Sequence, residues 1–155
     1  MTRKFKVLSL NISPEKGTEK TPVETVTVTA AGFKNDAHAG NWHRQISLLD
    51  QESVEYFASA SDLTIKPGDF GENITTEGID ITLLVPGKVI LGPGGLRLEV
   101  TQVGKECHGD DCTIFQKVGK CIMPARGVFC RVVSPGILHK NDTLELADTQ
   151  QQSEN

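Results

Sequence analysis

Four of the seven prolines in this 155-residue chain are followed directly by glycine, and this pairing constrains the fold more than any other feature. Proline fixes φ and the glycine after it tolerates positive φ, so each pair marks a tight turn. The pairs are Pro67-Gly68, Pro86-Gly87, Pro93-Gly94 and Pro135-Gly136. They indicate a chain of short segments separated by turns.

Short runs rich in β-branched and aliphatic residues lie between these turns, and several alternate with period two. We predict strands over residues 5–12, 23–30, 80–85, 88–91, 96–103, 127–133 and 143–146, with a further buried strand at 46–49. A doubly wound sheet would need a helix between successive strands, so the pattern favours a mainly β fold, a barrel or a sandwich. One helix is predicted over 51–60 after an N-cap at Asp50, and a second short one over 112–117.

The composition is that of one ordinary globular domain. Apolar residues make up 37% of the chain and charged residues 23%, which excludes extensive disorder and a coiled coil. We expect a single domain over residues 4–147. The tail over 148–155 has almost no apolar anchor, and we expect it to be disordered.

Charge and hydropathy exclude two classes of partner. A net charge of -4 and a pI near 5.5 leave no electrostatic footprint for nucleic acid. No apolar run approaches the ~20 residues that cross a bilayer, and the first residues do not resemble a signal peptide. We therefore expect a cytoplasmic protein with no nucleic-acid or membrane partner.

A polar connection over residues 35–45 precedes the buried strand at 46–49 and carries Asp36, His38, the single tryptophan Trp42 and Arg44. Polar groups placed just before a buried strand often line a pocket. The alternative is a turn with a hydrogen-bonded Asp and a solvated pair of histidines. Arg44 either clamps an anionic group or pairs with Asp36.

The segment 67–74 combines two glycines with acidic and amide side chains. Its backbone can approach a ligand closely and offer N–H groups to an anion, or it can be a structural turn. It lacks the endings of the common nucleotide-binding loops, which disfavours nucleotide binding.

All four cysteines lie between residues 107 and 130. Lys105 and His108 would favour the thiolate of Cys107, as a sulfur nucleophile or a soft-metal ligand requires, whereas neighbouring acidic residues would oppose it. A zinc site is an alternative, although the spacing is not that of a zinc finger, and its ligands would be Cys107, His108, Cys112 and Cys121. Cys130 alternates with apolar residues of its strand, which indicates a buried, inert thiol.

Taken in order, these segments resemble a stand-alone MOSC domain, a module related to the C-terminal part of molybdenum cofactor sulfurases. The resemblance rests on residues 36–40 with 44–49, 68–74, 98–102 with 105–108, and 127–132. It implies a barrel-like, mainly β domain linked to molybdenum cofactor or to sulfur transfer. Cys107 is the implied carrier of sulfur or ligand of molybdenum, and the residues implied to line the cofactor pocket facing it are Asp36, His38, Arg44, Gly71, Glu72 and Asn73.

The resulting hypothesis is a sulfurtransferase that acts through a persulfide on Cys107, with Lys105 or His108 favouring the thiolate. The acceptor would be held by Arg44, the glycine-loop N–H groups and Asn73. The chain has no desulfurase domain of its own, so the implied partners are a sulfur donor such as a cysteine desulfurase, and molybdenum cofactor or a molybdoenzyme as acceptor. Cys112 and Cys121 could instead resolve the persulfide as a disulfide or bind metal.

Two alternatives remain open from the residues alone. The domain could bind molybdopterin without turnover, with Arg44, Lys105 and Arg126 as candidates for its phosphate. It could also be a small structural zinc domain.

Overall fold

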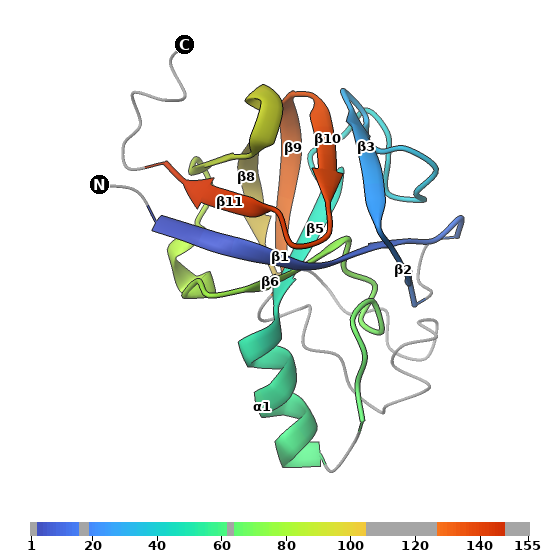
Figure 1. Ribbon diagram of the computed structural model, residues 1–155, viewed down its shortest axis with the longest axis vertical. Helices are drawn as coiled ribbons and strands as arrows, with labels where there is room; N and C mark the ends of the chain where they lie inside the picture. Colours follow the sequence, from blue (N-terminus) through green and yellow to red (C-terminus); the bar gives the residue numbers. More distant parts are fainter. Residues whose placement is uncertain (1–2, 16–18, 62–63, 105–126, 148–155) are drawn as a thin grey trace.

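The computed structural model describes residues 3–15, 19–61, 64–104 and 127–147, and its centre is a closed barrel (Figure 1). Closure occurs because the long strand β1 (Arg3–Ile12) pairs with β6 (Ile74–Glu77) and also with β11 (Thr143–Leu146). The circuit continues from β11 through β7 (Val89–Leu91), β8 (Arg97–Val103), β9 (Val128–Ser134) and β5 (Ile46–Asp50) back to β6. The short strand β2 (Thr21–Val23) pairs with the end of β1 outside this circuit.

A smaller sheet lies beside the barrel and consists of β3 (Thr25–Thr29), β4 (Gly32–Phe33) and β10 (Gly136–His139). Its strand order is β10-β3-β4, with both pairings antiparallel. Figure 1 shows β3 and β10 running along one side of the barrel. The described part of the chain is therefore mainly β, and the alternative of a two-sheet sandwich is excluded by the closed circuit.

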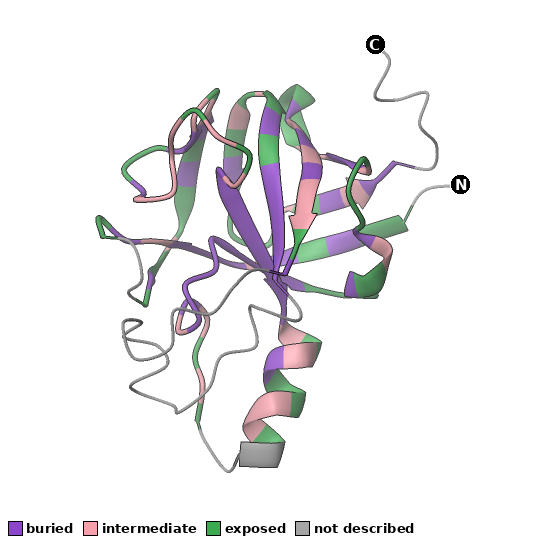
Figure 2. Cartoon of the chain, turned by 180° about the vertical axis from the view of Figure 1, so that it is seen from behind, coloured by how far each residue is buried: buried purple, intermediate pink, exposed green. Residues whose placement is uncertain are grey.

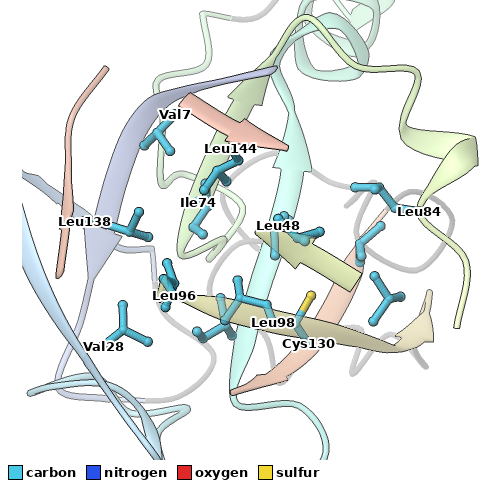
Figure 3. Close-up of a cluster of buried hydrophobic side chains, with 14 of the residues drawn as sticks. Val7, Val28, Leu48, Ile74, Leu84, Leu96, Leu98, Cys130, Leu138 and Leu144 are labelled. Carbon is cyan, nitrogen blue, oxygen red and sulfur yellow. The ribbon is translucent and has the colours of Figure 1, made fainter. Parts of the chain in front are cut away.

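The barrel interior is filled by alternate side chains of its strands, as period-two patterning requires. Figure 3 shows this core, in which Leu48, Ile74 and Leu98 are fully buried. Complete burial of such a side chain contributes ~1.5–3 kcal/mol. The side chains that point outward from β5 and β9 are also buried: Leu49 and Phe129 have 0% and 2% of their surface exposed. The outer face of these two strands is therefore covered, and the candidate site lies against it.

Helix α1 (Gln51–Ser61) follows β5 without a break and extends beyond the end of the barrel (Figure 1). The carboxylate of Asp50 accepts a hydrogen bond from the Ser53 backbone N–H at 3.2 Å, which confirms the predicted N-cap. The buried Val54 and the contact of Phe57 with Phe70, whose ring centroids are 5.3 Å apart, place one face of the helix against the barrel. Its other face is exposed in Figure 2.

Two of the strand predictions are wrong. Residues 80–85 contain the 3-10 turn Ile81–Leu83, because the Asp80 carboxylate accepts from the backbone N–H and the hydroxyl of Thr82 and so folds the chain locally. The run 23–30 is divided between β2 and β3, which belong to different sheets.

Three further strands, β4, β6 and β10, were not predicted. At the fourth Pro-Gly pair, Gly136 begins β10 and does not have the positive φ of Gly68, Gly87 and Gly94. The predicted helix 112–117 and the predicted disordered tail 148–155 lie outside the described residues.

Within the described ranges, no helix has the length and hydropathy that a membrane span requires.

Candidate functional site

The residues predicted to carry the chemistry, Cys107, Lys105 and His108, lie outside the described residues, as do Cys112, Cys121 and Arg126. The described chain stops at Gly104 and resumes at Gly127. These two glycines are neighbours, since the Gly104 N–H donates to the Gly127 carbonyl at 2.7 Å. The end of β8 and the start of β9 therefore lie side by side at these two glycines.

Asp36 is a charged residue of the predicted pocket whose side chain is fully enclosed, with 0% of its surface exposed. Its Oδ1 accepts from the Ser13 N–H at 2.9 Å and from Lys20 Nζ at 2.8 Å. Its Oδ2 accepts from the backbone N–H of His38 at 3.0 Å. Burial alone would raise the pKa of Asp36, but hydrogen bonds with His38 and Lys20, together with the Lys20 charge, hold that pKa well below its usual value.

Lys20 was not predicted as a site residue. Its side chain is 1% exposed, and its ammonium group also donates to the Ser13 hydroxyl at 3.2 Å. Its backbone N–H donates to the Gly68 carbonyl at 2.7 Å. Lys20 therefore joins the loop that carries Asp36 to the glycine segment that begins at residue 67.

His38 and Trp42 fix one another within the polar connection. Their rings are stacked with 15° between the planes and 6.4 Å between the centroids, and Trp42 Nε1 donates to the His38 carbonyl at 2.8 Å. His38 Nδ1 lies 3.7 Å from Asp36 Oδ2, and the His38 side chain is only 17% exposed. The expectation of a solvated histidine pair is thus wrong for His38, while the hydrogen-bonded Asp36 is confirmed.

Arg44 lies between two aromatic rings. Its guanidinium carbon is 4.7 Å from the centre of the Trp42 ring and 5.5 Å from the centre of the Phe129 ring. The expected alternative of a pair with Asp36 is wrong, because Lys20 occupies that carboxylate. Within the described residues, the buried Arg44 Nε has no hydrogen-bond partner, and no carboxylate pairs with this guanidinium.

The next residue on this loop ties it to the barrel. His43 Nε2 lies 2.7 Å from Gln102 Oε1, and the Thr101 hydroxyl donates to the His43 carbonyl. Gln102 Nε2 in turn donates to the Gly104 carbonyl at 2.7 Å. The loop that presents Arg44 is thereby held at the end of β8, where the described chain stops before Cys107.

The glycine segment 67–74 is a structural turn whose N–H groups are used internally. Gly68 N–H donates to Glu72 Oε2 at 3.0 Å, and Gly71 N–H donates to the Gly68 carbonyl at 2.9 Å. Both glycines have positive φ, 90° and 81°. The N–H groups of Gly68 and Gly71 were expected to face an anion, but they bind groups of the same segment instead.

Glu72 is 1% exposed, and its Oε2 also accepts from the Thr75 hydroxyl at 2.7 Å. Its Oε1 is buried and finds no hydrogen-bond partner in the part of the chain that the structure describes. Burial raises the pKa of this carboxyl, and the hydrogen bonds from Gly68 and Thr75 oppose the rise without cancelling it. Glu72 therefore favours its neutral, protonated form more than an exposed glutamate does.

Asn73 is fully buried and links three strands. Its Oδ1 accepts from the Ser47 N–H at 3.0 Å and from the Ser47 hydroxyl at 3.2 Å, while its Nδ2 donates to the Asn11 carbonyl at 3.2 Å. These bonds join β5, β1 and the start of β6. The cofactor-binding roles expected for Gly71, Glu72 and Asn73 stay predictions, because the polar contacts that these residues make in the structure support the loop.

A family model for the MOSC domain matches residues 35–145. This chain belongs to the MOSC domain family. The match includes the polar connection, the glycine segment and the strands that hold them, and the family is linked in general to molybdenum cofactor. A search of curated protein sequences finds no match.

Solved structures with the same fold include the proteins YuaD and YiiM. YuaD from Bacillus subtilis aligns with a TM-score of 0.80 at 21% identity and covers 94% of this chain and 97% of its own. YiiM from Geobacillus stearothermophilus aligns with a TM-score of 0.73 at 20% identity, covering 93% of this chain and 75% of its own. YiiM from Escherichia coli aligns with a TM-score of 0.64 at 21% identity, covering 94% and 70%. At these identities the likeness concerns the fold.

In this MOSC domain, Cys130 is confirmed as a core residue. It is 0% exposed inside the barrel, where Figure 3 shows its sulfur among leucine side chains. Burial, and to a lesser extent the Glu99 charge, raises the pKa of its thiol far above the usual value. Cys130 is therefore unsuited to act as a nucleophile at neutral pH.

No group of three or more His, Cys, Asp or Glu side chains with metal-binding geometry occurs in the described part of this MOSC domain. The ligands considered for zinc, including Cys107 and His108, lie outside that part. The arrangement that is described offers instead a guanidinium over two aromatic rings, an imidazole whose Nδ1 lies 3.7 Å from a carboxylate, and a hydrogen-bonded polar support. Such a set is suited to holding an anionic group and moving a proton.

Proposed function

We propose that this MOSC domain carries sulfur on Cys107 and passes it to a molybdenum-cofactor acceptor whose anionic group is held by Arg44. The observation that carries the proposal is the Arg44 guanidinium, which lies over the rings of Trp42 and Phe129 and whose buried Nε has no hydrogen-bond partner among the described residues. A buried donor that lacks a partner is costly, and a bound oxyanion would satisfy it. Guanidinium groups bind phosphate through two parallel hydrogen bonds, which a lysine cannot reproduce.

The donor set fits the phosphate of molybdopterin. Contact with two aromatic rings restricts the Arg44 side chain, so little side-chain freedom is lost when an anion binds. Asp36 does not compete for Arg44, because Lys20 neutralises it at 2.8 Å. When bound, the cofactor would supply a sulfur-accepting metal centre.

The sulfur step needs only groups of this chain and the donor. The Cys107 thiolate attacks the outer sulfur of a donor persulfide R–S–SH, a new S–S bond forms, the S–S bond of the donor breaks, and R–S⁻ leaves. The products are a persulfide on Cys107 and a donor thiolate, so the electrons balance without an oxidant. Lys105 or His108 would favour the attacking thiolate.

Cyanolysis and intact-mass analysis after incubation with a persulfide donor test the carrier role. Wild-type protein should gain one labile sulfur, Cys107→Ser none, and Cys130→Ser as much as wild type. Uptake by Cys107→Ser at the wild-type level would end the proposal.

Elemental and pterin analysis of protein purified from a cofactor-competent host tests the acceptor. Molybdenum and pterin retained by wild type and lost in Arg44→Gln are expected. Retained cofactor without any sulfur uptake would favour a binding module without turnover, and stoichiometric zinc in place of molybdenum would favour the structural zinc alternative.

A further inference from the structure

Asp36 and His38 are predicted to line the pocket, and they also face each other. Asp36 Oδ2 accepts the backbone N–H of His38 at 3.0 Å and faces the Nδ1 atom of the same residue at 3.7 Å. The Asp36 side chain is 0% exposed, so water does not compete for this carboxylate. The imidazole therefore has a fixed acidic neighbour on its Nδ1 side.

That carboxylate can only accept hydrogen bonds. Lys20 Nζ at 2.8 Å and the Ser13 N–H at 2.9 Å both donate to Asp36 Oδ1 and stabilise its ionised form. Because an ionised carboxylate has no proton to donate, the imidazole nitrogen that faces it is favoured as an N–H. The other nitrogen, Nε2, then carries the lone pair.

The ring is also fixed in orientation. Trp42 stacks on it with 15° between the planes, and Trp42 Nε1–H holds the His38 carbonyl at 2.8 Å. The Arg44 guanidinium carbon lies 4.7 Å from the centre of the same Trp42 ring, so the imidazole and the guanidinium both pack against one indole. A proton acceptor is thus held beside the proposed anion site.

We infer that Asp36 and His38 form a carboxylate–imidazole pair in which Nδ1 carries the proton and Nε2 is the proton acceptor of the site, with Lys20 as a positioning residue. The proton donor would be the thiol that must ionise in the proposed function, and this part of the inference rests on that function. The thiol gives its proton to Nε2, which yields a thiolate and an imidazolium, and the imidazolium then protonates the departing donor thiolate. Asp36 stays ionised throughout, and no redox partner is needed.

The tautomer can be measured on the protein alone. Two-bond ¹H–¹⁵N spectra, recorded at a pH where the imidazoles are neutral, separate protonated from lone-pair ring nitrogens, and His38→Gln and His43→Gln variants assign the signals. His38 should show Nδ1–H. His43 should show Nε2–H, because its Nε2 faces Gln102 Oε1 at 2.7 Å while the Gln102 amide nitrogen is occupied by Gly104.

His139 is a matched control that tests the effect of burial on a histidine–aspartate pair. Its Nδ1 lies 3.6 Å from Asp142 Oδ2, a separation similar to that in the inferred pair, but its side chain is 60% exposed. It should show a mixture of tautomers, since water competes with Asp142. An Nε2–H signal from His38 in the wild-type protein would overturn the inference.

The functional arm uses the rate of sulfur uptake. His38→Gln should lower the rate by about 100-fold, the lower end of the general-base effect, and His139→Gln should retain the wild-type rate. Asp36→Asn should switch His38 to Nε2–H, because an amide can donate to Nδ1. Uptake by His38→Gln at the wild-type rate would refute the role as proton acceptor. If wild-type protein takes up no sulfur, the proposed function fails, and the tautomer still decides whether the pair exists as inferred.

Discussion

Lys20 Nζ lies 2.8 Å from Asp36 Oδ1, and the two side chains are 1% and 0% exposed. Removing one member of a buried ion pair leaves the other without compensation, which costs ~3–5 kcal/mol. We expect Lys20→Met to lower the free energy of unfolding by about that amount in urea titrations. The exposed Lys34 provides a control, and Lys34→Met should change stability by less than ~0.5 kcal/mol. Equal stability of the two variants would show that the Lys20–Asp36 pair contributes nothing to the free energy of unfolding.

Glu72 should make the protein less stable as the pH rises. Because burial raises the pKa of Glu72, the folded state binds its proton more tightly than the unfolded state does. The contribution of Glu72 is therefore complete below the unfolded value of about 4.3 and is lost as the pH rises through the folded value. The contribution of Asp36 to stability depends on pH in the opposite direction. Because the pKa of Asp36 is lowered in the folded state, this contribution is present above about pH 4 and is lost at more acid pH.

Replacing Glu72 by Gln isolates the effect of Glu72 ionisation on the free energy of unfolding. The amide oxygen can still accept from the Gly68 N–H and the Thr75 hydroxyl, and the group cannot ionise. We expect Glu72→Gln to be more stable than wild type at neutral pH and equal to it at acid pH, as measured by denaturant titration at several pH values. A variant that is less stable only at neutral pH would show that the ionised form supports the fold.

Gly68 and Gly87 both follow proline and have similar positive φ values, 90° and 96°. A Cβ at Gly68 would overlap the Lys20 carbonyl oxygen, whereas nothing lies within 4 Å of a Cβ at Gly87. Gly87→Ala should therefore cost only the backbone strain, ~1–2 kcal/mol. Gly68→Ala should cost clearly more and should also weaken the Lys20–Asp36 pair, because the clash displaces backbone. Equal thermal stability of the two variants would contradict this packing.

Trp42 is the single tryptophan of the chain and stacks on Arg44, so its fluorescence reports on the proposed anion site. Titration with inorganic phosphate should change the emission of the wild-type protein in a saturable way. Arg44→Gln should abolish the response. Arg131→Gln should preserve it, because Arg131 is paired with Glu99 on the surface at 2.6 Å. A response that survives in Arg44→Gln would place anion binding elsewhere.

Cys130 should not react with a thiol reagent in the native protein, because its side chain is fully buried and its thiol resists ionisation. Labelling followed by peptide mass analysis should find Cys130 modified only after unfolding. Cys130→Ala should leave sulfur uptake unchanged, with a small loss of stability from the cavity. Native labelling of Cys130 would show that the barrel opens.

The barrel could be predicted from the sequence because its determinants are local. Pro-Gly pairs set turns, and alternation within single strands marks the buried face, as at Cys130. The prediction was wrong at residues 80–85 because the Asp80 side chain competes with strand pairing through a local hydrogen bond. The strand β6 was missed because its Thr75 and Thr76 are polar, yet they are fully buried.

The candidate site could be predicted only as a set of residues. The order of motifs in the sequence determined which loops belong together and that Asp36, His38 and Arg44 share one of them. The partners were decided by the tertiary structure: Lys20 for Asp36, and Trp42 with Phe129 for Arg44. A lysine is normally exposed, so nothing in the sequence marks Lys20 as buried. Such contacts form only when the strands close into the barrel. Closure brings together residues that are distant in the sequence, and the sequence does not show which of them will be neighbours.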